Sequence, residues 1–168
     1  PASNDGTLVS ALIAGRVSDV DSGAFSGIAV IAVDDSHGRW QYTTNGGGSW
    51  NDFGTPSAPS VGAARLLAAN ASTSVRFVPD ANWNGSVAGG LTFRAWDQSS
   101  GTAGATADTS SNGGSSAFST TTASAGISVT SVNDAPAGTD RTVTTLEDTA
   151  YTFSVADFGF SDANDSPA

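Results

Sequence analysis

The sequence predicts an all-β protein of the β-sandwich class, and three observations carry that prediction. Short apolar runs alternate with polar residues, and each run is closed by Gly, Asn, Asp or Pro. Helix-favouring residues are scarce: the chain has no Lys or Met, and only Glu147 is a glutamate among 16 acidic residues. Val, Thr, Gly and Asn, which favour strands and turns, are abundant. The length of 168 residues suits one domain, or one domain and a fraction of another.

Eight segments have the pattern of strands. Val75 and Phe77 alternate with Ser74 and Arg76, as expected for antiparallel strands with one buried face. Gly27–Val33 is apolar on both faces, which predicts a central strand. The alternative of a short helix is open only for Ser60–Asn70. In order, the expected strands are Thr7–Ala14, Gly27–Val33, Arg39–Thr44, Gly48–Phe53, Ala64–Ala68, Ser74–Val78, Leu91–Asp97 and Ala125–Val132.

Two connecting segments stand out. Thr43–Gly48 contains Asn-Gly between two aromatic runs and predicts a hairpin turn, since Asn-Gly supplies the positive φ angles that such turns need. Gln98–Thr122 is rich in Gly, Ser, Thr and Ala and has little to bury, so we expect a long flexible surface loop there.

An internal repeat gives the domain organisation. Asp5 and Asp148 lie 143 positions apart, and each is followed 14 positions later by the Asp of a Ser-Asp pair, Asp19 and Asp162. Both intervals carry an apolar–polar strand pattern, and similarity at a fixed offset is typical of repeat arrays. We therefore expect one full repeat over residues 1–134, and a linker with the truncated start of the next repeat over 135–168.

The second part is too short for a domain. Pro136 stops the preceding strand and holds the junction extended, which makes a stiff join. Ala137–Ala168 has about 30 residues and no closing strands, too few for a core of its own. We expect it to be disordered, or to add a strand to a sheet edge of its own molecule or of a neighbour.

Composition and charge exclude several classes of function. Without Cys there is no disulfide, thiol catalysis or thiolate metal site, and without Lys no Lys–Asn isopeptide bond or Schiff base. The net charge of −10 argues against nucleic acid as a partner. No apolar run approaches the roughly 20 residues of a membrane helix, so we expect no membrane insertion.

Several motifs resemble one known family. Val132–Pro136, followed by Leu146–Thr149, resembles the joint between cadherin-like tandem repeats of giant bacterial surface and adhesin proteins. Phe77–Gly85 resembles the family's turn of aromatic, Pro, Asn, aromatic and Asn-Gly, and Leu91–Asp97 resembles the strand after it. Trp40–Tyr42, with the Asn-Gly turn and Trp50, is similar to the family's hairpin. The resemblance covers almost the whole chain.

This resemblance implies an Ig/cadherin-like Greek-key β-sandwich with calcium at the repeat junctions. It also implies a non-enzymatic structural repeat of an RTX-type adhesin, exported by a type I pathway to the surface of a Gram-negative bacterium. The partners would be neighbouring repeats of the same chain, and calcium would stiffen the joints into a rod. One departure is Asn4-Asp5, where the family has Glu-Asp, so the start of the first repeat has one carboxylate fewer than the family pattern.

The expected calcium ligands are carboxylate and amide oxygens at two poles of the repeat. Asp19 and Asp21 form an Asp-x-Asp pair on a loop, and by resemblance Asp97 joins them. At the junction, Asn133 and Asp134 form the joint itself. The family pattern adds Asp5 and Asp80 from the first repeat, and Asp162 and Asp165 from the next. The alternative is that these Asx residues only form turns, satisfying their own backbone N–H groups.

Other features have competing interpretations. The aromatic residues Trp40, Tyr42, Trp50, Trp83 and Trp96 could present a carbohydrate-stacking face, but their alternation favours the core. A glycan- or protein-binding adhesion module, using the Trp40–Trp50 hairpin or the Gln98–Thr122 loop, is the alternative function. His37 follows Asp34-Asp35-Ser36 on a turn, whereas catalytic triads gather from distant segments. We therefore expect no enzymatic activity.

Overall fold

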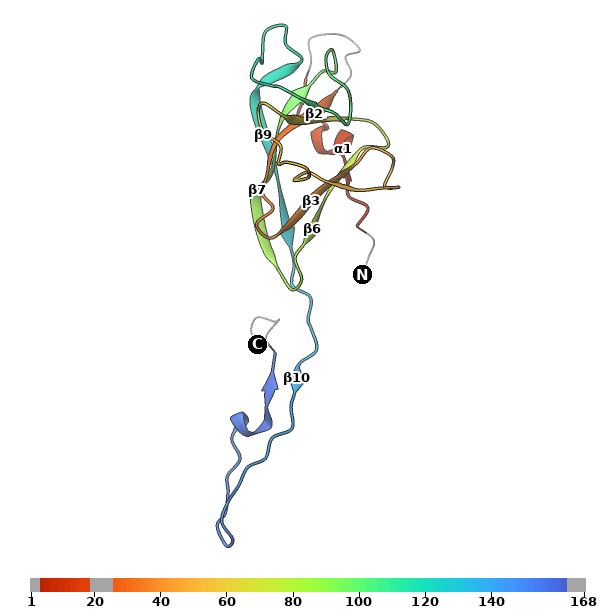
Figure 1. The fold of residues 1–168 in the computed structure, drawn as a ribbon. Helices are drawn as coiled ribbons and strands as arrows, with labels where there is room; N and C mark the ends of the chain where they lie inside the picture. Colours follow the sequence, from red (N-terminus) through yellow and green to blue (C-terminus); the bar gives the residue numbers. More distant parts are fainter. Residues whose placement is uncertain (1–3, 19–25, 163–168) are drawn as a thin grey trace. The chain divides into compact units, whose positions relative to one another are not determined.

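The computed structural model describes residues 4–18 and 26–162, and its contacts divide the chain into two units. The first is Pro1–Val129 and the second is Thr130–Ala168. The boundary falls a few residues before the one expected at 134. The first unit is mostly β, with two antiparallel sheets of four and five strands and one short α-helix, as a β-sandwich requires (Figure 1).

The four-stranded sheet is built from one hairpin and two long-range strand pairs. Its order is β1 (Thr7–Leu8), β6 (Ser74–Pro79), β3 (Gly38–Thr43) and β4 (Asn51–Asp52). β3 and β4 form the expected hairpin across the Asn-Gly turn, with Gln41 opposite Asp52. The Asn45 side chain fixes this turn, because its Oδ1 accepts hydrogen bonds from the Thr43 hydroxyl at 2.8 Å and the Ser49 N–H at 3.0 Å.

The five-stranded sheet has the expected central strand. Its order is β8 (Thr106–Ala107), β5 (Ala64–Ala68), β2 (Gly27–Val33), β7 (Gly85–Trp96) and β9 (Phe118–Val129). β2 pairs with β5 on one side and β7 on the other, which confirms the prediction for Gly27–Val33. β5 is a strand, so the alternative of a helix over Ser60–Asn70 is wrong.

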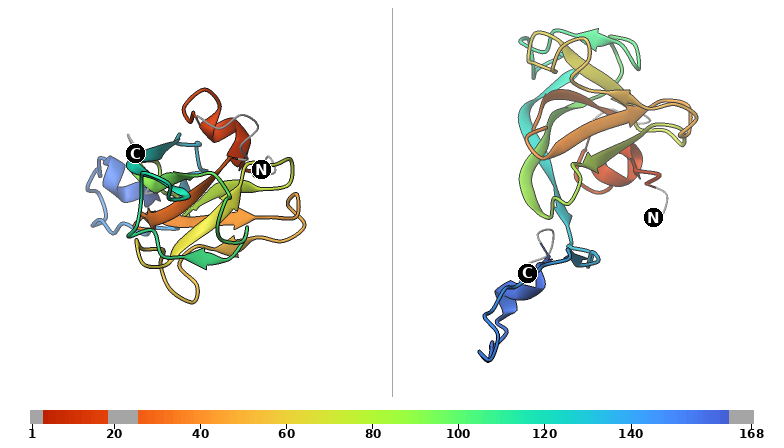
Figure 2. Two further views of the ribbon diagram at one scale, coloured as in Figure 1. Left: turned by 90° about the horizontal axis from the view of Figure 1, so that it is seen from above. Right: turned by 60° about the horizontal axis from the view of Figure 1, so that its bottom comes forward.

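Buried side chains of both sheets form the main core, between the two layers of strands drawn in Figures 1 and 2. Ile28 and Val30 of β2 pack with Trp40 and Tyr42 of β3 in one cluster of buried side chains. The alternating residues of β2 and β5 face the other way and form a second cluster on the outer face of the larger sheet. That cluster consists of Ala29, Ala64, Leu66, Ala68, Trp96, Ala117 and Phe118.

The segment after β7 covers this second cluster, and the expectation of a flexible loop over Gln98–Thr122 is wrong. Its backbone is tied down at several points: Leu66 N–H donates to Ala105 O at 3.0 Å, and Thr109 N–H donates to Val61 O at 2.8 Å. Thr109 is fully buried. β9 begins at Phe118, seven residues before the start expected at Ala125. Backbone hydrogen bonds to distant residues order this segment, together with the few apolar side chains that it adds to the second cluster, Ala117 and Phe118.

A short helix replaces most of the first expected strand. Only Thr7 and Leu8 of Thr7–Ala14 are extended, as β1, and Val9–Ile13 forms α1. Val9 and Ile13 are buried, and their spacing of four places both on one side of a helical turn. The buried apolar residues of this segment therefore recur with the period of a helix and not with that of a strand.

The second unit is small and open. β10 (Ala137–Gly138) pairs antiparallel with β11 (Phe160–Ser161), and a 3₁₀ turn, η1 (Val155–Phe158), precedes β11. Ser154 and Asp157 form a capping box on this turn. Every described side chain of residues 130–162 is exposed or half-buried. Across the described parts of both units, no helix is long and apolar enough to cross a membrane.

Candidate functional site

Three of the expected calcium ligands, Asp19, Asp21 and Asp165, lie outside the described residues. Asp5 precedes β1, Asp80 follows β6, and Asp97 follows β7. Asp80 closes a turn through its backbone, donating its N–H to His37 O at 3.0 Å. The first unit thus places these carboxylates at strand ends.

Asp97 behaves as a turn former. Its Oδ1 accepts hydrogen bonds from the backbone N–H of Ser99 at 2.7 Å and from the Ser99 hydroxyl at 2.6 Å. Two carboxylates outside the expected ligand set, Asp34 and Asp108, make the same kind of turn. Their hydrogen bonds with Ser36 and Ser110 hold the pKa of each carboxyl below its usual value. Asx turns therefore account for part of the Asp-rich loops.

In the second unit, Asn133 and Asp134 lie on the extended segment before β10, and Asp162 directly follows β11. The Asn133 amide donates to Asp134 O at 2.7 Å. The oxygen chemistry of this set fits calcium. Within residues 4–18 and 26–162, however, no three His, Asp or Glu side chains gather into a group that could hold a metal ion. The expected junction set draws on both units and on residues that the structure does not describe.

The aromatic residues are mainly structural. Trp40, Tyr42 and Trp96 are buried, which confirms the prediction of a core role for these three. Trp83 is half-buried and stacks on His37, with ring centroids 4.8 Å apart. Trp50 is also half-buried and lies under the Arg76 guanidinium, 3.9 Å from its ring centroid. These contacts hold the turns next to the four-stranded sheet.

The loop around His37 is held by hydrogen bonds between its carboxylate side chains and nearby backbone N–H groups. Asp35 Oδ1 accepts a hydrogen bond of 2.7 Å from the Trp40 N–H, which fixes the start of β3. The Asp34 carboxylate is engaged with Ser36. Both carboxylates thus stabilise this turn by accepting backbone hydrogen bonds.

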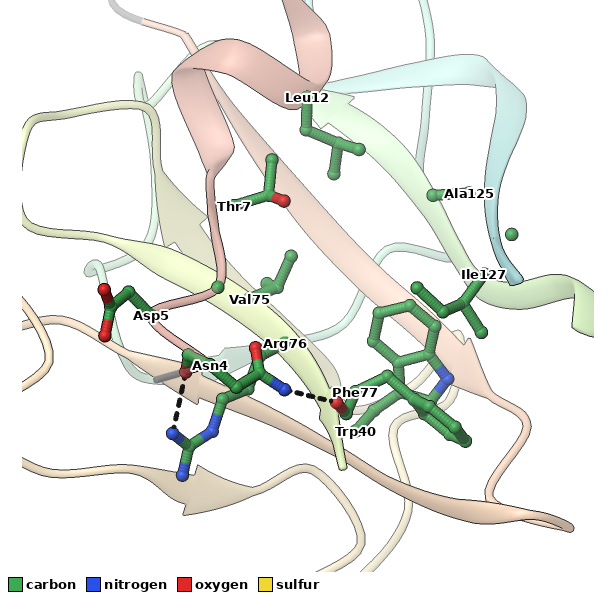
Figure 3. Close-up of a pocket in the computed structure, with 12 residues that line it drawn as sticks. Asn4, Asp5, Thr7, Leu12, Trp40, Val75, Arg76, Phe77, Ala125 and Ile127 are labelled. Atoms are coloured by element: carbon green, nitrogen blue, oxygen red, sulfur yellow. Dashed lines mark hydrogen bonds between the residues drawn. The ribbon is translucent and has the colours of Figure 1, made fainter. Parts of the chain in front are cut away.

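A groove opens in the first unit between the outer strands of its two sheets (Figure 3). It has a volume of about 420 Å³. Residues of β1 and β6 line one side, and residues of β9 line the other. Sequence reasoning did not predict this groove. It follows from the pairing of β1 with β6 and of β9 with β7, which no local pattern indicates.

The groove wall is held by a small polar network. The Asn4 amide donates to Phe77 O at 2.7 Å, and Arg76 Nη1 donates to Asn4 O at 3.0 Å. Trp40 forms part of the apolar wall, and its buried Nε1 has no hydrogen-bond partner among the described residues. A buried donor without a partner is uncommon in native structures and costs free energy.

Comparison with protein-family models, with curated proteins and with solved structures finds no significant match for this chain. The functional argument therefore rests on the residues and the geometry of the chain itself.

Proposed function

We propose that the chain is part of a tandem array in a large extracellular bacterial adhesin. Residues 1–134 form one cadherin-like Greek-key repeat, and residues 135–168 form the linker and the start of the next. The role of the repeat is structural: it extends a rod whose joints are stiffened by calcium.

The observation that carries this proposal is the internal repeat. The intervals from Asp5 to Ser18 and from Asp148 to Ser161 have the same length and both end in Ser followed by Asp. The likeness is one of sequence, because the local structures differ: the first interval contains the α-helix α1 at Val9–Ile13, and the second contains the 3₁₀ turn η1 at Val155–Phe158. Sequence similarity at a fixed offset is what supports a repeat array.

Calcium has a physical role in such a joint. Asn133 and Asp134 stand near the start of the second unit, close to the boundary after Val129, and Asp5, Asp80, Asp162 and Asp165 are the other proposed contributors. Carboxylates that gather around a divalent cation lose their mutual repulsion, and ligands from two repeats lose their independent motion. The chain has neither Cys nor Lys, so a metal is the strongest crosslink open to it.

Calcium titration of the full chain tests the proposal. With calcium about 100-fold above its dissociation constant, we expect the melting temperature to rise by roughly 5–10 °C, because a ligand that binds only the folded state stabilises it. EDTA should reverse the shift.

Two variants localise the effect. Asp134→Asn removes a charged ligand of the joint and should abolish most of the shift. Asp108→Asn is the matched control, since Asp108 engages Ser110 in the first unit and is outside the proposed ligand set. Equal melting temperatures in calcium and in EDTA, or full retention of the shift by Asp134→Asn, would contradict the proposed joint.

A further inference from the structure

The groove of the first unit lies between two strands that, among residues 4–18 and 26–162, are each paired on one side only. β1 is the outermost strand of the four-stranded sheet, beside β6, and β9 is the outermost strand of the five-stranded sheet, beside β7. Figure 3 shows Thr7 on one side of the groove and Ala125 and Ile127 on the other. The sandwich is therefore open along this flank.

The free edge of β9 is unusually unprotected. Over the 12 residues Phe118–Val129 it carries no charged residue and no proline, the devices that commonly prevent a sheet edge from pairing with another chain. Ala125, Ile127 and Val129 are half-buried on the inward face, while Ser124 and Ser128 are exposed. An added strand would find free backbone groups at this edge and apolar side chains just inside it.

The second unit presents a segment with matching chemistry. Thr142–Leu146 lies outside any described strand or helix and is composed of Thr, Val and Leu. Its Thr and Val residues are β-branched and favour a strand. Leu146 has 79% of its surface exposed. The segment is also uncharged, although acidic residues stand on both sides of it.

We propose that two copies of this chain associate by strand addition. The segment Thr142–Leu146 of one copy pairs antiparallel with the free edge of β9 in the other and covers the groove between β9 and β1. If each copy inserts its segment into the other, the two copies form a closed dimer. If the insertion is not reciprocal, each copy can add to the next and the assembly grows as a chain. This inference does not depend on the calcium joint.

Charge favours this pairing over other contacts. Each copy has a net charge of −10, so two copies repel, and a contact between uncharged surfaces adds the least further repulsion; both β9 and Thr142–Leu146 are uncharged. Arg141, the basic residue directly before the segment, is engaged within its own unit: it donates to Ala156 O and its charge acts on the Asp157 carboxylate.

Sedimentation equilibrium of the full chain in EDTA tests the inference. From about 10 μM to 1 mM protein we expect the weight-average mass to rise toward twice the monomer mass or more. The rise should be larger at about 0.5 M than at 0.05 M salt, because salt screens the repulsion between acidic copies.

Two pairs of variants test the two partners of the contact. Thr144→Pro removes a backbone donor from the inserted segment, while Thr144→Val keeps it and remains β-branched. Ala125→Glu places a charged side chain in the groove, while Ser124→Glu adds the same charge on the exposed face of the same strand. Thr144→Pro and Ala125→Glu should each weaken association by roughly tenfold or more, and the two controls by much less. Circular dichroism and melting check that each variant is folded.

Three outcomes would overturn the inference. A parent chain that stays monomeric up to about 1 mM has no such contact. If Thr144→Pro associates like the parent while Ala125→Glu does not, β9 pairs with another edge, such as β9 of the second copy. If folded Ala125→Glu associates like the parent, the groove is not the docking site.

Discussion

Close backbone packing explains why certain residues must be glycine. A Cβ atom at Gly27 would lie 2.6 Å from Leu67 O and 2.8 Å from Trp96 Cε3. Gly27 begins β2 between two neighbouring strands, so neither side can move away easily. At Gly89 in β7, by contrast, a Cβ would meet nothing within 4 Å.

Gly27→Ala should therefore destabilise the first unit by about 1–3 kcal/mol, the usual cost of forcing extra volume into a packed site. Gly89→Ala is the matched control and should change stability by less than about 0.5 kcal/mol. Urea unfolding followed by tryptophan fluorescence measures both. Equal stabilities for the two variants would mean that β2 is not packed as described.

The aspartates show the limit of residue-level reasoning from sequence. The short carboxylates were expected in loops, and Asp34, Asp97 and Asp108 are found in Asx turns. A turn former and a calcium ligand have the same side chain and the same loop context. Only the surrounding atoms distinguish the two roles, so the calcium sites remain a prediction.

Among the elements, strands with clear apolar faces were predictable and the covering segment was not. β2 and β5 have the predicted bounds. For β2 the sequence is apolar on both faces, and residues of both faces join buried clusters. For β5 the sequence also allowed a short helix, and only the pairing with β2 decides for a strand. The segment between β7 and β9 has few apolar side chains, so its sequence resembles a linker. Its order comes from backbone bonds to residues far away in the chain, such as Thr109 N–H to Val61 O.

Trp96 should be the anchor of that covering segment. It is 2% exposed, and its Nε1 donates to Ser100 O at 2.7 Å. Trp96→Ala should cost about 3–5 kcal/mol and should accelerate amide exchange at Leu66 and Thr109, whose N–H groups bond across this contact.

Trp50→Ala provides the comparison for this variant. Trp50 is half-buried, and its ring makes a cation–π contact with the Arg76 guanidinium. Such a contact contributes about 0.5–1 kcal/mol at an accessible site. If the two tryptophan variants were equally stable, the segment after β7 would not depend on the second cluster. Urea unfolding and hydrogen exchange measure both effects.

At the scale of the molecule, the two units differ in how their side chains are buried. All the buried hydrophobic residues among those described lie in the first unit, between Val9 and Phe118. The second unit exposes its large apolar side chains, and its order comes from local contacts such as the capping box of η1. The sequence indicated this difference through length alone, because about 30 residues cannot enclose a core.

Limited digestion with chymotrypsin, at a protein concentration low enough to keep the chain monomeric, should therefore cut the second unit first. The exposed sites there are Leu146, Tyr151, Phe153, Phe158 and Phe160. Trp96 and Phe118, which are buried, should resist until the first unit unfolds. Mass spectrometry of the early fragments identifies the cuts. Early cleavage at Trp96 or Phe118 would contradict the described core.

The pairing of β9 with β7 also has a mechanical consequence. The chain leaves the first unit through β9, whose pairing with β7 runs from Phe118 to Val129. A pull on the C-terminal side of this unit is directed along β9 and loads those hydrogen bonds in shear. Bonds loaded in shear break together rather than one at a time, so β9 should resist such a pull better than β1, which pairs with β6 only at Thr7 and Leu8.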